Sequence, residues 1–109
     1  MTEKKLLMLD PDPTFEVQDI EIPRAGKEPM RIDVVFRFMA VDEYLKTARE
    51  MADRPLVDLL EVLIHSWGES VSPPYSHDVL VQLCRSYPKA GRVLLRAYER
   101  ELYEVEEKN

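Results

Sequence analysis

The residues best suited to chemistry in this chain are two histidines and the serines and acid beside them. His65 precedes Ser66, and the run Ser76-His77-Asp78 contains the residue types of a catalytic triad. Neighbours in sequence point to different sides of a helix, whereas the members of a triad converge on one point. We therefore interpret Ser76 to Asp78 as a helix start, where side-chain oxygens bind free backbone N–H groups. This interpretation predicts that the protein is not an enzyme.

Cofactor and metal sites also lack the residue spacing that they need. The chain has one cysteine, Cys84, and its two histidines do not lie at a ligand spacing. With only three glycines it has no phosphate-binding loop. Cys84 falls on the apolar side of its predicted helix, as free cysteines commonly do, and one cysteine cannot form an internal disulfide. We therefore expect no catalytic residue, no metal and no cofactor, in a cytoplasmic protein.

The overall charge narrows the classes of partner. The 109 residues carry 15 Lys and Arg against 21 Asp and Glu, a net charge of −6, which counts against holding nucleic acid through its phosphates. The connection between Trp67 and Ser76 is too long for a DNA-reading helix-turn-helix. The apolar run Leu6–Leu9 is too short for a signal peptide, and the stretch Leu56–Trp67 contains charged residues. We expect a partner that is neither nucleic acid nor membrane.

The N-terminal third predicts an antiparallel β-hairpin over residues 15–38. Its second half alternates most clearly, with one apolar face made by Met30, Ile32, Val34, Phe36 and Phe38. In its first half the alternation changes phase between Val17 and Ile20, which indicates a bulge. A polar loop over residues 23–29 joins the two halves. Residues 1–14, with two Asp-Pro steps, are predicted to be a flexible N-terminal tail.

The rest of the chain is predicted to be helical. Apolar residues recur there at helical spacing, and Pro and Gly mark the breaks. Asp42 is a candidate cap of the first helix, and Gly68 is expected to end the second. We predict helices over about 42–53, 55–67, 76–87 and 88–106. With the hairpin they make a single α+β domain over residues 15–109: an N-terminal antiparallel β-hairpin followed by a bundle of about four α-helices.

One pattern of charge stands out on the last predicted helix. Four cations, which we call the basic strip, step by three, four and four residues and so share one helix face: Lys89, Arg92, Arg96 and Arg100. One interpretation is a solvated face supported by i,i+4 pairs such as Arg100–Glu104, each worth a few tenths of a kcal/mol. The other is a docking strip for an acidic segment of a partner. The exposed edge of the hairpin is a second candidate surface, through strand addition.

An ordered set of motifs runs through the C-terminal half. It comprises Trp67-Gly68, Pro74-Tyr75-Ser76, Tyr87-Pro88 and Tyr98, and the chain closes on Lys108-Asn109. Together with the strand Ile32–Phe38 and the helix after it, this set resembles the tail assembly chaperone family of long-tailed bacteriophages. The resemblance covers about residues 20–109. Its motif residues also have a core-packing interpretation, so we expect them to be structural.

The resemblance implies a non-catalytic assembly protein of a phage or prophage. Such a protein binds the tape-measure protein and helps to recruit tail-tube subunits, the major tail protein, during tail morphogenesis in the bacterial host cytoplasm. Many members of the family are also made in a longer, frameshifted form. The alternative function is a small prophage regulatory or inhibitor protein that acts by protein–protein binding. An enzyme that uses His65 or His77 ranks behind both.

Overall fold

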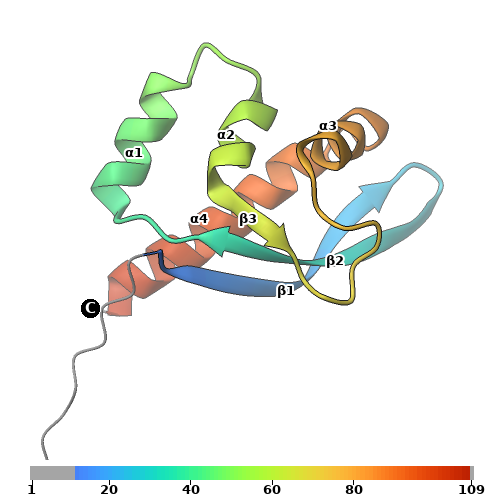
Figure 1. Ribbon diagram of the computed structural model, residues 1–109, viewed down its shortest axis with the longest axis horizontal. Helices are drawn as coiled ribbons and strands as arrows, with labels where there is room; N and C mark the ends of the chain where they lie inside the picture. The colour runs from blue at the N-terminus through green and yellow to red at the C-terminus, as the bar shows by residue number, and fades with distance from the viewer. Residues whose placement is uncertain (1–11, 109) are drawn as a thin grey trace, which may run out of the picture.

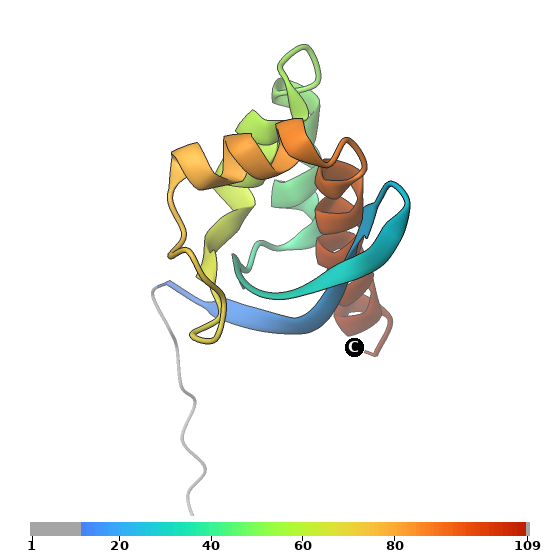
Figure 2. The ribbon, with the colours of Figure 1, turned by 90° about the vertical axis from the view of Figure 1, so that its right-hand side faces the viewer.

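A small antiparallel sheet with four helices gathered on one side of it forms the body of the protein (Figures 1 and 2). The computed structural model describes residues 12–108. The strands are β1 (Thr14–Arg24), β2 (Lys27–Arg37) and β3 (Ile64–Trp67), and the helices are α1 (Val41–Glu50), α2 (Leu56–Leu63), α3 (His77–Ser86) and α4 (Ala90–Lys108). The sheet order is β1-β2-β3. The α+β class is therefore confirmed, although the hairpin is part of a three-stranded sheet.

The two long strands pair antiparallel, as the predicted hairpin requires. Ile22 lies opposite Met30 and Val17 opposite Val34, with a register shift between Val17 and Ile20. The bulge predicted there is confirmed, and it lets residues on both sides of the phase change face the core. Asp19 sits in the bulge at a φ of 57°, where its backbone N–H donates to Asp33 Oδ1 at 2.9 Å.

The N-terminal tail predicted over residues 1–14 overlaps the start of β1 in the structure. Of these, residues 1–11 lie outside the described part of the chain. Thr14 already belongs to β1, and the carbonyl of Pro13 accepts a hydrogen bond from the Phe38 N–H at 2.9 Å. The sheet hydrogen bonding therefore begins before residue 15, where the hairpin was expected to start.

The prediction of one helix over residues 55–67 is wrong at its C-terminal end. α2 stops at Leu63, and residues 64–67 form β3, in which Trp67 pairs with Val34 and Ile64 with Phe36. Gly68 does not cap a helix either: its N–H donates to the Asp33 carbonyl at 2.8 Å and continues the pairing with β2. Residues 64–67 form a strand because the strand provides hydrogen-bond partners for the backbone groups of β2 and buries Ile64 and Trp67. This tertiary pairing overrides the local helical periodicity.

The ends of the other helices also differ from the sequence-based bounds. α1 ends at Glu50, and its N-cap is Ala40, so the prediction that Asp42 caps it is wrong; Asp42 lies in the first turn. Ser76 caps α3 as expected, because its Oγ accepts the Val79 N–H at 3.2 Å. α4 begins at Ala90, after Pro88 and Lys89 in a turn. A bundle of four helices is not confirmed, since α4 packs along β1 and α2 runs directly into the sheet.

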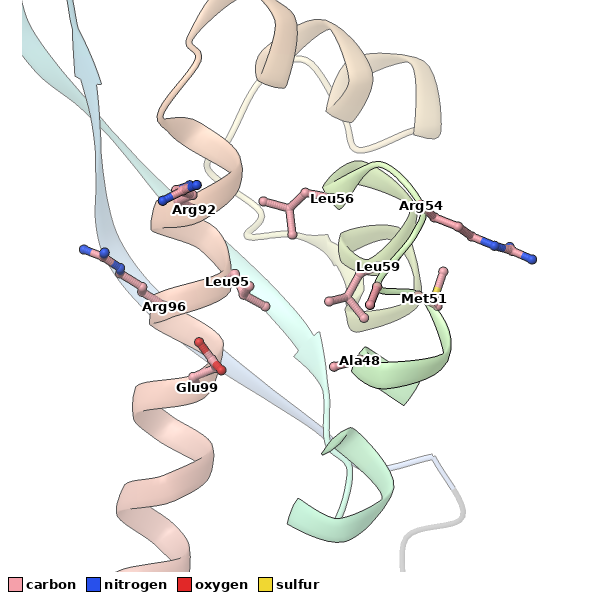
Figure 3. A pocket seen from close by; sticks show the side chains of 10 residues that line it. Ala48, Met51, Arg54, Leu56, Leu59, Arg92, Leu95, Arg96 and Glu99 are labelled. Carbon is pink, nitrogen blue, oxygen red and sulfur yellow. The ribbon is translucent and has the colours of Figure 1, made fainter. Parts of the chain in front are cut away.

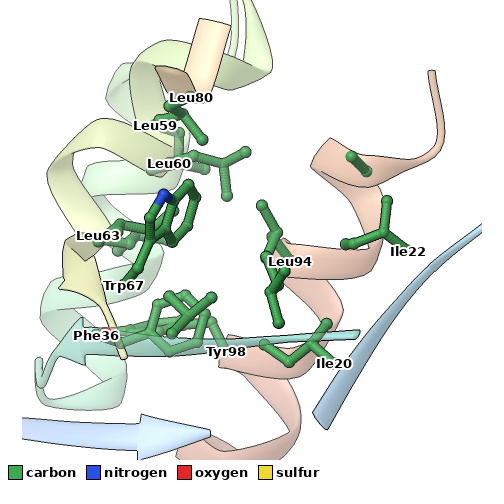
Figure 4. Packing of buried hydrophobic residues seen from close by; sticks show 14 of the residues in the cluster. Ile20, Ile22, Phe36, Leu59, Leu60, Leu63, Trp67, Leu80, Leu94 and Tyr98 are labelled. Atoms are coloured by element: carbon green, nitrogen blue, oxygen red, sulfur yellow. The ribbon is translucent and has the colours of Figure 1, made fainter. Parts of the chain in front are cut away.

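The core lies between the sheet and the helices, and α4 contributes its centre. Figure 4 shows Leu94 and Tyr98 of α4 between the side chains of α2, β3 and α3 on one side and Ile20 and Ile22 of β1 on the other. Around Tyr98 the rings of Phe36, Tyr44 and Phe15 lie 5.3–5.5 Å away, centroid to centroid. This aromatic packing fixes α4, and with it the direction in which its arginines point.

Candidate functional site

The basic strip lies on the exposed side of α4 and in the turn before it. Lys89 precedes the helix, while Arg92, Arg96 and Arg100 belong to it, and all four side chains are exposed. Leu94 and Tyr98, the fully buried residues of the same helix, explain this orientation because they turn its opposite face inward. No ion pair joins any of the four cations to a carboxylate among residues 12–104, whose side chains the structure describes.

A groove runs beside the first part of the strip, between α4 and the helices α1 and α2 (Figure 3). Its volume is about 440 Å³. Its floor is apolar and comes from three elements, with Ala48 and Met51 from α1 and its end, Leu56 and Leu59 from α2, and Leu95 from α4. Arg92 and Arg96 border this floor on the α4 side, and Arg54 borders it on the side of α1 and α2. We call this feature the arginine-flanked groove.

The second half of the strip has different neighbours. Arg96 and Arg100 line a hollow between α4 and the bulge of β1, together with Asp19, Glu21 and Glu101. Here the cations share their surroundings with carboxylates, which lower the local positive potential. Three of the four cations that the sequence placed on one helix face therefore line two different hollows. Arg92 belongs to the groove, Arg100 to the hollow beside β1, and Arg96 to both.

The family-motif residues divide between the core and the surface. Trp67 and Tyr98 are buried, and the indole of Trp67 packs edge-on against Tyr75 at 4.9 Å between ring centroids. Tyr87 lines an apolar pocket with Trp67, under the loop that precedes α3. Of the remaining motif residues, Gly68 is buried, while Pro74, Ser76 and Pro88 are exposed.

Burial sets the protonation of the phenols and the thiol. It raises the pKa of Tyr98 to about 12, an effect that the backbone of Met39 opposes and Glu43 adds to. The pKa of Tyr44 is also raised, by burial first and then by Glu99, whose Oε2 accepts the Tyr44 hydroxyl hydrogen bond at 3.1 Å. Burial likewise raises the pKa of the Cys84 thiol, which disfavours the thiolate needed for nucleophilic chemistry.

The two histidines lie on different elements. His65, on β3, has its Nδ1 3.0 Å from Ser66 Oγ, and His77, on α3, has its Nδ1 2.6 Å from Glu61 Oε2 of α2. Among the described residues, no group of three His, Cys, Asp or Glu side chains could hold a metal ion. No helix in the same part of the chain is long and apolar enough to span a membrane.

Sequence reasoning missed the other half of the groove. Arg54 follows α1 in a turn, outside any helical pattern, and the floor residues come from three elements whose packing the sequence does not reveal. The sequence carries no signal for this half. Leu45, one turn before Ala48 on the same helix, is 45% exposed in the structure, but single exposed apolar side chains are common on protein surfaces.

Comparison with known proteins identifies one family. The whole chain, residues 1–109, matches a family model described as phage tail assembly chaperone. Neither curated proteins nor solved structures gave a match to this chain.

Proposed function

The chain belongs to the phage tail assembly chaperone family, and from this we propose that it binds the tape-measure protein and helps to recruit tail-tube subunits during tail morphogenesis. It acts by binding, without catalysis, in the cytoplasm of the bacterial host. The observation that carries the proposal is the match of the family to the full length of the chain.

The exposed surface of α4 supports a binding role. Arg92, Arg96 and Arg100 project from a helix whose position is fixed by its buried side, so they are held ready for a partner. Although the chain has a net charge of −6, these arginines make one face of α4 positive, and a positive face is complementary to an acidic segment of a partner. We therefore assign the basic strip, Lys89 included, to the contact with a tail protein.

The fold also bears on how a partner attaches. β1 forms one edge of the sheet, but the bulge at Asp19 interrupts it, and bulges are a common device against edge-to-edge pairing. Strand addition along β1 is therefore disfavoured. Side-chain contacts on the helical face are the more suitable way to bind and later release a partner.

The proposal is tested by co-expressing the protein with the tape-measure protein of the same phage or prophage. We expect the tape-measure protein to move from the insoluble to the soluble fraction and to co-purify with this chain. A tape-measure protein that stays insoluble in its presence would contradict the proposal. The control is a His65→Ala, His77→Ala variant, which should behave as the wild type provided that it folds, because the proposed activity uses neither imidazole.

A further inference from the structure

The floor and the borders of the arginine-flanked groove differ sharply in chemistry. The floor consists of aliphatic side chains, of which Leu59 is the most buried, at 7% exposed. The side chains of Arg92 and Arg96 lie on the α4 side of the floor and that of Arg54 lies on the side of α1 and α2, with the guanidinium groups of Arg54 and Arg96 directed away from the floor (Figure 3). An apolar channel with cations on both sides is complementary to a helix with one apolar face and carboxylates along its flanks.

The charges in the groove favour an acidic occupant. Three arginines and one carboxylate, Glu99, line it. Glu99 is already engaged, since it accepts the hydrogen bond of the Tyr44 hydroxyl at the contact of α1 with α4. Among the side chains of residues 12–104, none of the three arginines forms an ion pair. The positive charge on the two borders is therefore left for a partner to neutralise.

The apolar surface extends beyond the groove along α1. Leu45 and Ala48 are three residues apart on α1 and so share a helix face, and Ala52 lies in the turn that follows the helix. Ala48 and Ala52 line the groove, and the exposed Leu45 continues the same face by one turn. An apolar surface of this length accommodates several side chains of a partner helix. A partner that inserted only one apolar side chain would leave most of the surface exposed to water.

We propose that the arginine-flanked groove docks an acidic amphipathic helix of a tail protein. The apolar face of that helix packs on Leu56, Leu59 and Leu95, and its carboxylates face Arg54 on one side and Arg92 and Arg96 on the other. The inference rests on the proposed function for the identity of the partner as a tail protein. Within the basic strip it assigns the contact with this helix to Arg92 and Arg96, because Lys89 lies outside the groove and Arg100 lies in the hollow with Asp19, Glu21 and Glu101.

Two double variants of equal charge separate a local effect of the groove from an effect of net charge. Arg92→Glu with Arg96→Glu reverses the α4 border of the groove, while Lys27→Glu with Arg85→Glu reverses two exposed cations outside both the groove and the basic strip. Both pairs are exposed and change the net charge by the same amount, so both should fold, which circular dichroism checks. We expect the first pair to weaken binding of the co-expressed tape-measure protein about tenfold, and the second no more than about twofold. Equal losses in the two variants would overturn the assignment to the groove.

Photo-crosslinking locates the partner directly. A benzophenone amino acid replaces Ala52, an exposed residue of the groove, and in a matched control it replaces Ala25, an exposed residue of the hairpin turn. We expect Ala52 to crosslink to a segment with apolar residues at helical spacing and an excess of Asp and Glu, and Ala25 not to do so. If the complex forms but Ala52 captures nothing or captures a basic segment, the groove inference fails while the proposed function stands. If the wild type forms no complex, both fail.

Discussion

Tyr98 is the residue on which the packing of α4 depends. Its side chain is fully buried, with the rings of Phe36, Tyr44 and Phe15 around it. Its hydroxyl is also buried. The backbone of Met39 influences its ionisation, but among the described residues no group reaches it with the geometry of a hydrogen bond. A buried hydroxyl without a well-formed hydrogen bond costs about 1–3 kcal/mol of desolvation. The ring of Tyr98 therefore stabilises the core, while its hydroxyl does not.

Replacing Tyr98 by phenylalanine should not lower the stability of the protein. The change removes only the hydroxyl and keeps the ring contacts, so we expect the free energy of unfolding to stay the same or rise by about 1 kcal/mol. Tyr44→Phe is the matched control: it deletes the hydrogen bond to Glu99 and should lower that free energy by about 1 kcal/mol. Urea denaturation at neutral pH measures both, and a clear loss in Tyr98→Phe would show that its hydroxyl has a partner.

The same substitution should change the response to alkali. The unfolded chain ionises Tyr98 near pH 10.0, whereas the folded protein keeps its proton up to a pKa of about 12. Between these values the unfolded state has fewer protons bound, so stability falls as the pH rises, by up to about 1.4 kcal/mol per pH unit for one phenol. Tyr98→Phe should lose less stability than the wild type between pH 10 and 12, in urea denaturations repeated across that range.

At the scale of elements, β3 shows where sequence patterns fail. Ile64 and Trp67 are three residues apart, as on the buried face of a helix, and both are buried. A regular strand would turn them to opposite faces, but the register shift between Val35 and Phe36 of β2 lets both reach the core. The bulge of β1, in contrast, was visible in the sequence, because there the apolar alternation itself changes phase. The extra residue of the second bulge, His65, lies in β3, a strand of only four residues, where a spacing of three between apolar residues cannot be told from that of a helix.

The glycine that follows β3 provides a test of this element. A Cβ on Gly68 would lie 2.7 Å from the Cβ of Asp33, so Gly68→Ala has to push β3 away from β2. We expect a loss of about 1–3 kcal/mol in the free energy of unfolding, as for an overpacked core. Gly91→Ala is the control. Its Cβ would meet the flexible Leu56 Cδ2 at 3.0 Å, and the better helix propensity of alanine, about 1 kcal/mol, offsets that contact. Urea denaturation that ranks the two variants equally would contradict the close approach at Gly68.

At the scale of the whole molecule, the family, the α+β class and the shared helix face of the α4 cations could be predicted from the sequence. The spacing of the cations is a local pattern, and local patterns are visible without a structure. The groove beside them was not predictable, because α1, α2 and α4 meet there only after β3 has turned the chain back onto the sheet. Arg54 and Arg92 belong to segments far apart in sequence, and nothing in either segment indicates that they border the same apolar floor.

The net charge of the whole molecule and the local charge of the groove make opposite predictions about salt. If the overall charge of −6 governed the encounter with an acidic helix, added salt would screen repulsion and strengthen binding. At physiological ionic strength, however, charges more than about 8 Å apart are largely screened, so the arginines that border the groove dominate close contact.

We therefore expect the affinity for the tape-measure protein to fall as NaCl rises from about 50 to 300 mM. In Arg92→Glu, Arg96→Glu the slope should flatten or change sign. Titration calorimetry over that range decides between the two, and binding of the wild type that strengthens with salt would show that the arginines do not meet carboxylates.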